Sequence, residues 1–143
     1  MKRSPQLRDL SDDHHHGLVL AQKAKQAAAS GDERAAAEVW DEVEMQFETE
    51  LEPHFLIEET LLAPPLARAD ESLLVGRLLK EHRALRECVQ PGHGRTPADL
   101  SRFGELLENH IRFEERELFE VAQKRLTAEE LDAIAEACRA NRA

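Results

Sequence analysis

Residues 33–62 read ERAAAEVWDEVEMQFETELEPHFLIEETLL. Apolar side chains recur in this stretch at intervals of three or four residues, which is the spacing of one face of an α-helix. That face consists of Trp40, Val43, Phe47, Leu51, His54, Glu58 and Leu61. The stretch therefore predicts a long amphipathic helix whose apolar face includes a His and a Glu one turn apart.

Two later stretches also place polar residues on an apolar face. The fourth helical stretch repeats the His and Glu at a spacing of four residues, and its face consists of Leu100, Phe103, Leu107, His110, Glu114, Leu118 and Val121. The third stretch has one polar member on its face, which consists of Val75, Leu78, His82, Leu85 and Val89. We therefore expect His82, His110 and Glu114 to face the same interior as the pair in the second stretch.

Helical periodicity covers residues of about 11–29, 33–62, 71–89 and 96–125, and a short fifth segment covers about 127–140. The connections between the long segments are short, so successive helices should pack antiparallel. No segment alternates like a β-strand for more than a few residues. The sequence predicts an all-α fold: an up-down-up-down antiparallel four-helix bundle with a short C-terminal fifth helix, in a single domain over 1–143 with the bundle at about 10–125.

Residues typical of helix ends mark most of these boundaries. Ser11 or Asp12 is predicted to cap the first helix, and Pro64-Pro65 is predicted to end the second. Thr96, followed by a proline, is predicted to cap the fourth helix. Thr127 opens a capping-box sequence at the start of the fifth.

The charge and composition exclude several classes of protein. The net charge of −10, from 19 Lys and Arg against 29 Asp and Glu, disfavours nucleic acid and anionic membranes as partners. The two cysteines, Cys88 and Cys138, are too few for a disulfide scaffold. No signal-peptide pattern and no membrane span is evident. We expect a reduced, cytoplasmic protein.

The first helix contains three consecutive histidines, of which one helical face can hold one. His14 aligns with Leu10, Leu18 and Ala21, so the periodicity favours His14 as the inward residue. An irregular first turn would instead bring in His15, and both stay candidates. His16 is expected in solvent, and the whole run has the composition of a surface metal-binding tract. His93, in a Gly-flanked loop, is also expected at the surface.

A metal ion resolves the cost of the inward carboxylates. An unpaired buried carboxylate is very unfavourable, and the inward faces supply no Arg or Lys to pair Glu58 and Glu114. Four His and two Glu exceed the four ligands of a tetrahedral zinc and fit two ions with bridging carboxylates. We expect metal removal to destabilise the protein, or to make the two carboxylates take up protons.

These features resemble the hemerythrin-like (HHE) family. The matching segments, in order and one per helix, are Asp13-His14-His15, His54-Phe55-Leu56-Ile57-Glu58-Glu59, Glu81-His82 and His110-Ile111-Arg112-Phe113-Glu114-Glu115. The resemblance implies two non-haem iron ions with an oxo or hydroxo bridge, for which zinc or manganese are substitutes. It also implies these metal ligands: His14 or His15, His54, Glu58, His82, His110 and Glu114.

The sequence departs from the oxygen-carrying members of that family at two positions. Those members have a second His one turn after the first on the third helix, where this chain has Arg86. Their last carboxylate follows its His by five residues, which would be Glu115, whereas Glu114 keeps the inward face. We therefore expect an extra open position on the ion served by the third helix, close to Arg86, and poor oxygen carriage.

The family resemblance implies several related functions. We expect a protein that binds or senses oxygen, nitric oxide or peroxide rather than an enzyme. The alternatives are an enzyme that turns over peroxide or nitric oxide, a protein that stores or delivers iron, and a structural zinc bundle. A sensor would need a separate protein partner. The sequence does not predict an oligomeric state.

Overall fold

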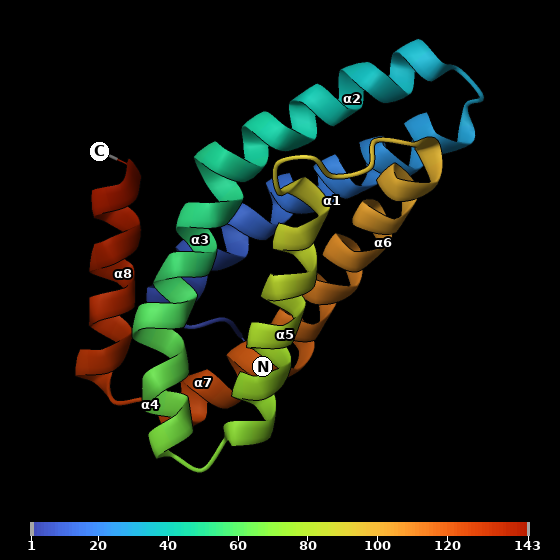
Figure 1. Cartoon of the computed structure of the whole chain (residues 1–143). Coiled ribbons are helices and arrows are strands. Elements are labelled where there is room, and N and C mark those ends of the chain that lie inside the picture. The colour runs from blue at the N-terminus through green and yellow to red at the C-terminus, as the bar shows by residue number, and fades with distance from the viewer. Residues whose placement is uncertain (1, 143) are drawn as a thin grey trace.

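All the regular structure among residues 2–142, which the computed structural model describes, is helical. The bundle has four long arms, drawn in Figure 1, and this confirms the predicted all-α architecture. The first arm consists of a 3₁₀ turn η1 (Pro5–Leu7) and α1 (Arg8–Ala29), and the second of α2 (Glu33–Gln46), η2 (Phe47–Leu51), α3 (Glu52–Ile57), η3 (Glu58–Leu62) and α4 (Ala63–Arg68). The third arm is α5 (Ser72–Val89), and the fourth consists of α6 (Pro97–Phe113), η4 (Glu114–Leu118) and α7 (Phe119–Arg125). The fifth helix is α8 (Ala128–Arg142).

Two of the predicted caps are present, and one is not. Thr96 and Asp99 form a reciprocal capping box at α6, and Thr127 and Glu130 exchange the same two hydrogen bonds before α8. The prediction that Ser11 or Asp12 caps the first helix is wrong, since α1 begins at Arg8. Ser11 Oγ instead donates to Glu115 Oε2 across the bundle (2.8 Å).

Proline does not end the second arm where the sequence predicts. Helix α4 continues past Pro64-Pro65 to Arg68, with both prolines in its first turn. A first turn tolerates proline because its N–H groups have no partner within the helix. The π-helical turn η3 directly precedes α4, and η2 likewise precedes Pro53. Proline has no backbone N–H and would interrupt the i to i−4 hydrogen bonds of a continuous α-helix. The π turns, whose hydrogen bonds span five residues, change this pattern just before the prolines.

The π-helical turns also bend the arms around the interior. Glu52, Ala63 and Phe119 donate their backbone N–H groups five residues back, one at the end of each turn. Figure 1 shows α2 and α3 meeting at a bend. The turns η3 and η4 begin at Glu58 and Glu114, so the helical register changes where the sequence places the inward carboxylates.

The apolar interior consists of two clusters with a polar layer between them. One contains Leu20, Trp40 and Phe103, and the other contains Leu10 and Phe119, each with other buried residues. On α1, His14 lies between Leu10 of one cluster and Leu20 of the other. The buried His and Glu side chains therefore lie at the junction of two apolar cores, where water is largely excluded.

Helix α8 packs on the outside of this bundle. Its buried residues Leu131, Ile134 and Cys138 join the cluster around Leu10, and Figure 1 shows the helix alongside α3 and α4. Within residues 2–142, none of the helices combines the length and the apolar character needed to cross a membrane.

Candidate metal centre

Six polar side chains from all four arms are buried in the layer between the two apolar clusters. Glu58 and Glu114 have no exposed surface, and among residues 2–142 their ion pairs are formed with imidazoles alone. The exposed fractions of the four histidine residues are 0% for His82, 2% for His110, 3% for His54 and 5% for His14. Six of the seven residues predicted as ligands therefore meet in one place.

The six side chains form two groups that could each hold a metal ion. One group is His14, His54, Glu58 and Glu114, and the other is Glu58, His82, His110 and Glu114. The donor atoms within each group lie within 4.8 Å of one another. Each group thus offers two imidazole nitrogens and two carboxylate oxygens, and the groups share both carboxylates.

The oxygens of each carboxylate are divided between the two groups. Glu114 Oε1 lies 2.6 Å from His14 Nε2 and 3.7 Å from His54 Nε2. Its Oε2 lies 3.0 Å from His110 Nε2 and 3.8 Å from His82 Nε2. Glu58 divides in the same way, with Oε2 at 3.1 Å from His54 Nε2 and Oε1 at 3.1 Å from His82 Nε2. Both carboxylates thus have the arrangement of a bridging ligand.

Two buried atoms of this layer lack a hydrogen-bond partner. Among the described residues, neither His110 Nε2 nor Glu114 Oε2 makes a hydrogen bond, although the two atoms are 3.0 Å apart. Buried polar atoms are nearly always satisfied, so each such atom needs an explanation. Imidazole nitrogen and carboxylate oxygen are both donors to iron, zinc and manganese, and the residues present therefore fit a metal.

Each of the four imidazoles uses its second nitrogen to donate to a carboxylate. His54 Nδ1 donates to Asp13 (3.1 Å) and His82 Nδ1 to Glu59 (2.6 Å). The other two pairs are His110 with Glu81 (2.7 Å) and His14 with Glu115 (2.7 Å). Each arm supplies the carboxylate for the His of the next arm, and the last arm supplies it for the first. This ring directs all four Nε2 atoms toward Glu58 and Glu114, as is usual for metal-binding His.

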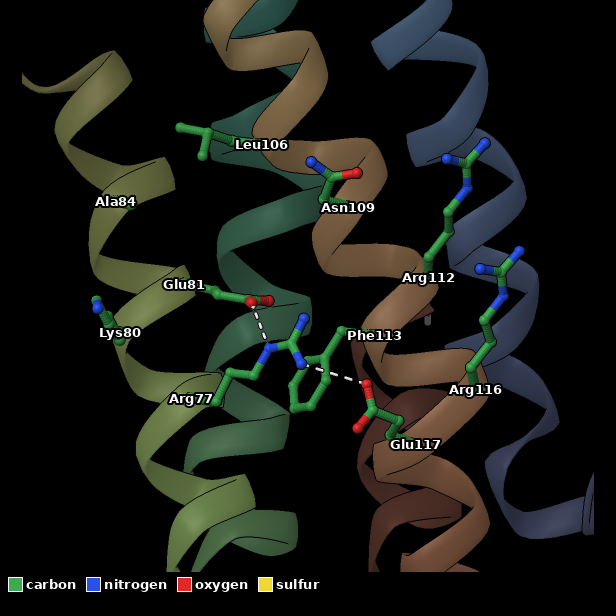
Figure 2. A pocket seen from close by; sticks show the side chains of 10 residues that line it. All are labelled: Arg77, Lys80, Glu81, Ala84, Leu106, Asn109, Arg112, Phe113, Arg116 and Glu117. Atoms are coloured by element: carbon green, nitrogen blue, oxygen red, sulfur yellow. Dashed lines mark hydrogen bonds and ion pairs between the residues drawn. The ribbon is translucent and has the colours of Figure 1, made fainter.

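An arginine pairs with each carboxylate of this ring. Arg77 Nε donates to Glu81 (2.8 Å), and Figure 2 shows this contact in an open groove of about 710 Å³ between α5 and α6. The same guanidinium lies 4.1 Å from the centroid of the Phe113 ring. The three remaining pairs are Arg3 with Glu115 (3.3 Å), Arg86 with Glu59 (2.7 Å) and Arg142 with Asp13 (2.9 Å).

The pKa values reflect this arrangement of charges. Burial disfavours the imidazolium form, but the nearby carboxylates of Glu58 and Glu114 outweigh burial and raise the pKa of His82 to about 9 and that of His110 to about 10. The pKa of Glu114 is well below its usual value, because the imidazoles of His110, His14 and His54 outweigh its burial. This direction favours the first of the two expected outcomes of metal removal, a less stable protein, over proton uptake at Glu114.

The comparison with known families agrees with this geometry. A family model described as the Hemerythrin HHE cation binding domain matches residues 6–122. The chain belongs to this family. No curated protein and no solved structure matches the chain. The match covers all six His and Glu residues of the two groups and ends before α8.

Four residues that the sequence analysis discussed in connection with the HHE site lie outside the two groups. His15 and His16 are exposed on α1, so the structure does not bring His15 to the centre, and His14 is the inward residue. Arg86 does not approach the centre either, because its guanidinium is directed to Glu52 and Glu59. Glu115 accepts from His14 Nδ1 and leaves the inward position to Glu114.

The expectation of an exposed His93 is wrong. Its side chain is only 7% exposed, and its ring centroid lies 4.7 Å from that of Trp40. Nδ1 donates to Gly94 O (2.7 Å), and Nε2 lies 2.5 Å from Glu44 Oε2. The loop folds back over the tryptophan, which the local sequence does not reveal.

Sequence reasoning missed half of the carboxylate ring of the HHE site. Glu59 and Glu115 were recognisable as neighbours of the predicted ligands, but Asp13 and Glu81 were not assigned to a histidine. A signal exists, because each of the four carboxylates is adjacent in sequence to a residue of the two groups. On a helix, an adjacent residue points about 100° away, toward the neighbouring arm.

Proposed function

We propose that this HHE domain holds two non-haem iron ions and binds a small ligand, namely oxygen, nitric oxide or peroxide, at that centre. The observation that carries the proposal is the division of Glu58 and Glu114 between two groups of four donors. The proposed ligands are His14, His54, Glu58, His82, His110 and Glu114. When bound, iron would supply open coordination positions and redox chemistry.

The number of protein donors supports exogenous ligand binding. An octahedral ion has about six coordination positions. Each group supplies four protein donors, so about two positions per ion remain for solvent and an exogenous ligand. The two groups have equal numbers of protein donors, which supports equal numbers of free positions on the two ions rather than the expected surplus on the side of the third helix. With Arg86 turned away, the free positions are alike on both sides.

A small cavity that borders histidines of both groups supports a small ligand. It has a volume of about 20 Å³ and borders His14, His54 and His110. Its other walls include Gly17, Leu51, Leu107 and Ile111, and Gln46 and Glu50 lie toward the surface. This volume accommodates roughly one water-sized molecule. A diatomic ligand fits the site better than a larger substrate.

Metal analysis with an optical spectrum tests the proposal. Protein purified in air should contain about two iron ions per chain, with an absorption band typical of an oxygen-bridged iron pair. One tetrahedral zinc per chain would instead support the structural zinc bundle. Iron well above two per chain would support storage.

An oxygen experiment then addresses what the centre does. We expect the anaerobically reduced protein to oxidise when oxygen is admitted, and the reduced spectrum not to return under vacuum. A spectrum that reverses under vacuum would contradict this and indicate oxygen carriage. Multiple turnovers of peroxide or nitric oxide would favour the enzymatic alternative.

A further inference from the structure

The two groups of donors differ in where their supporting arginines come from. On the side of His82 and His110, Arg86 and Arg77 both come from α5, within the bundle. On the side of His14 and His54, Arg3 precedes residues 6–122 and Arg142 follows them. One half of the centre is therefore supported by segments outside the family match.

Helix α8 contributes to this half through one chain of contacts. Arg142 Nη2 donates to Asp13 Oδ1 (2.9 Å), and Asp13 Oδ2 accepts from His54 Nδ1 (3.1 Å). The same arginine donates through Nη1 to Asp9 Oδ1 (3.1 Å), one turn earlier on α1. The apolar face of α8, which includes Leu131 and Ile134, anchors the helix on the bundle. The guanidinium is thus fixed relative to α1 by contacts at both ends of α8.

We propose that α8 is a positioning element for one half of the metal centre, in which Arg142 holds Asp13 so that His54 presents Nε2 to its ion. This inference rests on the proposed function, because it concerns the affinity of that centre for metal. Arg142 is a positioning residue, since Asp13 and His54 lie between it and the two shared carboxylates.

The physical argument is one of orientation. An imidazole can rotate about its broad terminal torsion, and the hydrogen bond at Nδ1 selects which nitrogen faces the metal. Asp13 has a side chain that is 36% exposed, so without a second partner it can turn to solvent. Arg142 binds the oxygen that His54 does not use, and this leaves Oδ2 directed at the imidazole. In the other half, the ion pairs of the arginines within residues 2–142 are formed with residues outside α8, including Glu59 and Glu81.

The experiment is an anaerobic titration of the metal-free full chain with Co²⁺, followed by visible absorption and calorimetry. The wild type should bind two ions. Arg142→Ala should weaken one of the two binding steps by about 10-fold and change its absorption bands, since loss of a partner behind a metal ligand costs roughly 10- to 100-fold in affinity. Asp13→Asn should weaken the same step at least as much. Arg142→Lys, which keeps the charge, should restore part of the loss.

Arg139→Ala is the matched control, because Arg139 lies one turn earlier on α8 and pairs with Glu136 alone among the described ion pairs. It should bind both ions as the wild type does. Two unchanged steps in Arg142→Ala would overturn the inference. Equal weakening of both steps, with a lower melting temperature of the metal-free form, would also overturn it and make α8 a general stabilising element. A wild type that binds no cobalt would overturn the proposed function as well.

Discussion

Two of the places where a histidine meets a glutamate in this HHE domain differ in their surroundings. In the centre, Glu58 and Glu114 are fully buried and face imidazoles alone among the described residues. Near the end of α2, His93 approaches Glu44, whose side chain is 39% exposed. Arg95 Nε lies 3.4 Å from the same glutamate oxygen.

The difference shows that proximity of His and Glu does not by itself make a metal site. Glu44 has water and a guanidinium to stabilise its charge, so no cation is required there. The two buried carboxylates have neither, and the cost of burying them falls when cations bind between them. Both candidate groups among residues 2–142 lie in the buried layer, and neither includes His93.

The largest expected effect comes from removing a shared carboxylate. Glu114→Gln should reduce bound metal from about two ions per chain to nearly none, because each ion loses a charged donor and the neutral amide is a poor ligand. Glu44→Gln, the matched change at the other region, should leave the metal content unchanged. Metal analysis of the two purified variants makes the comparison. Full metal content in Glu114→Gln would place the ions elsewhere.

Metal removal should have the next largest effect. When the free metal concentration is about 100 times the dissociation constant, each bound ion stabilises the folded state by about 3 kcal/mol. For a chain of this size, that corresponds to a rise in melting temperature of roughly 6–12 °C per ion. Calorimetry of the metal-free and metal-loaded forms measures the difference. His93→Ala should lower both melting temperatures equally, and equal melting of the two wild-type forms would contradict a buried metal site.

The arms of the fold could be predicted because each hydrophobic stripe has helical period over many turns. The inward orientation of the histidines follows from the same hydrophobic helix faces, and all four are buried: His14, His54, His82 and His110. The helix ends were less predictable where tertiary contacts decide them. Ser11, for example, bonds to Glu115 instead of capping its own helix.

The layer around the centre could not be predicted from periodicity alone. Whether Glu81 is paired with His110 or with solvent depends on the rotation of two helices about their axes, which a stripe fixes only to within a residue. The bonds to Arg3 and Arg142 join residues more than 100 positions apart. His93 looked like a loop residue because the ring of Trp40 that covers it is distant in sequence.

The metal-free centre should also show a pH dependence that the metal-loaded form lacks. A histidine whose pKa is higher in the folded state stabilises that state when it is protonated. This stabilisation is complete at pH values below the pKa of unfolded His, 6.5, and is lost as the pH rises through about 9 for His82 and about 10 for His110. Glu114 has a lowered pKa, so its contribution is present above 4.5 and is lost as the pH falls.

The metal-free protein should therefore be most stable between about pH 4.5 and 6.5, and its melting temperature should fall by a few degrees toward pH 10. Melting curves across this range, with and without metal, test the expectation. A metal-free melting temperature that rises from pH 6 to pH 10 would show that the imidazoles are neutral in the folded state.

The smallest effects should come from two glycines, one in each region. A Cβ at Gly94 would collide with the carboxylate of Asp99, which is held in the capping box of Thr96. Gly94→Ala should therefore cost about 1 kcal/mol, the value of a lost helix cap. A Cβ at Gly17 would lie 2.8 Å from Ile111 Cδ1, the end of a flexible side chain.

Gly17→Ala should change the free energy of unfolding by less than about 0.5 kcal/mol, since the gain in helix propensity, about 1 kcal/mol, is offset by displacing Ile111 at roughly 0.5–1.5 kcal/mol. That displacement narrows the cavity beside His14 and His54, so azide should bind the metal-loaded variant a few-fold more slowly. Gly94→Ala, which lies far from the cavity lining, should bind azide at the wild-type rate. Urea unfolding and stopped-flow absorption measure the two quantities, and an equal azide rate in both variants would mean that the ligand reaches the centre by another path.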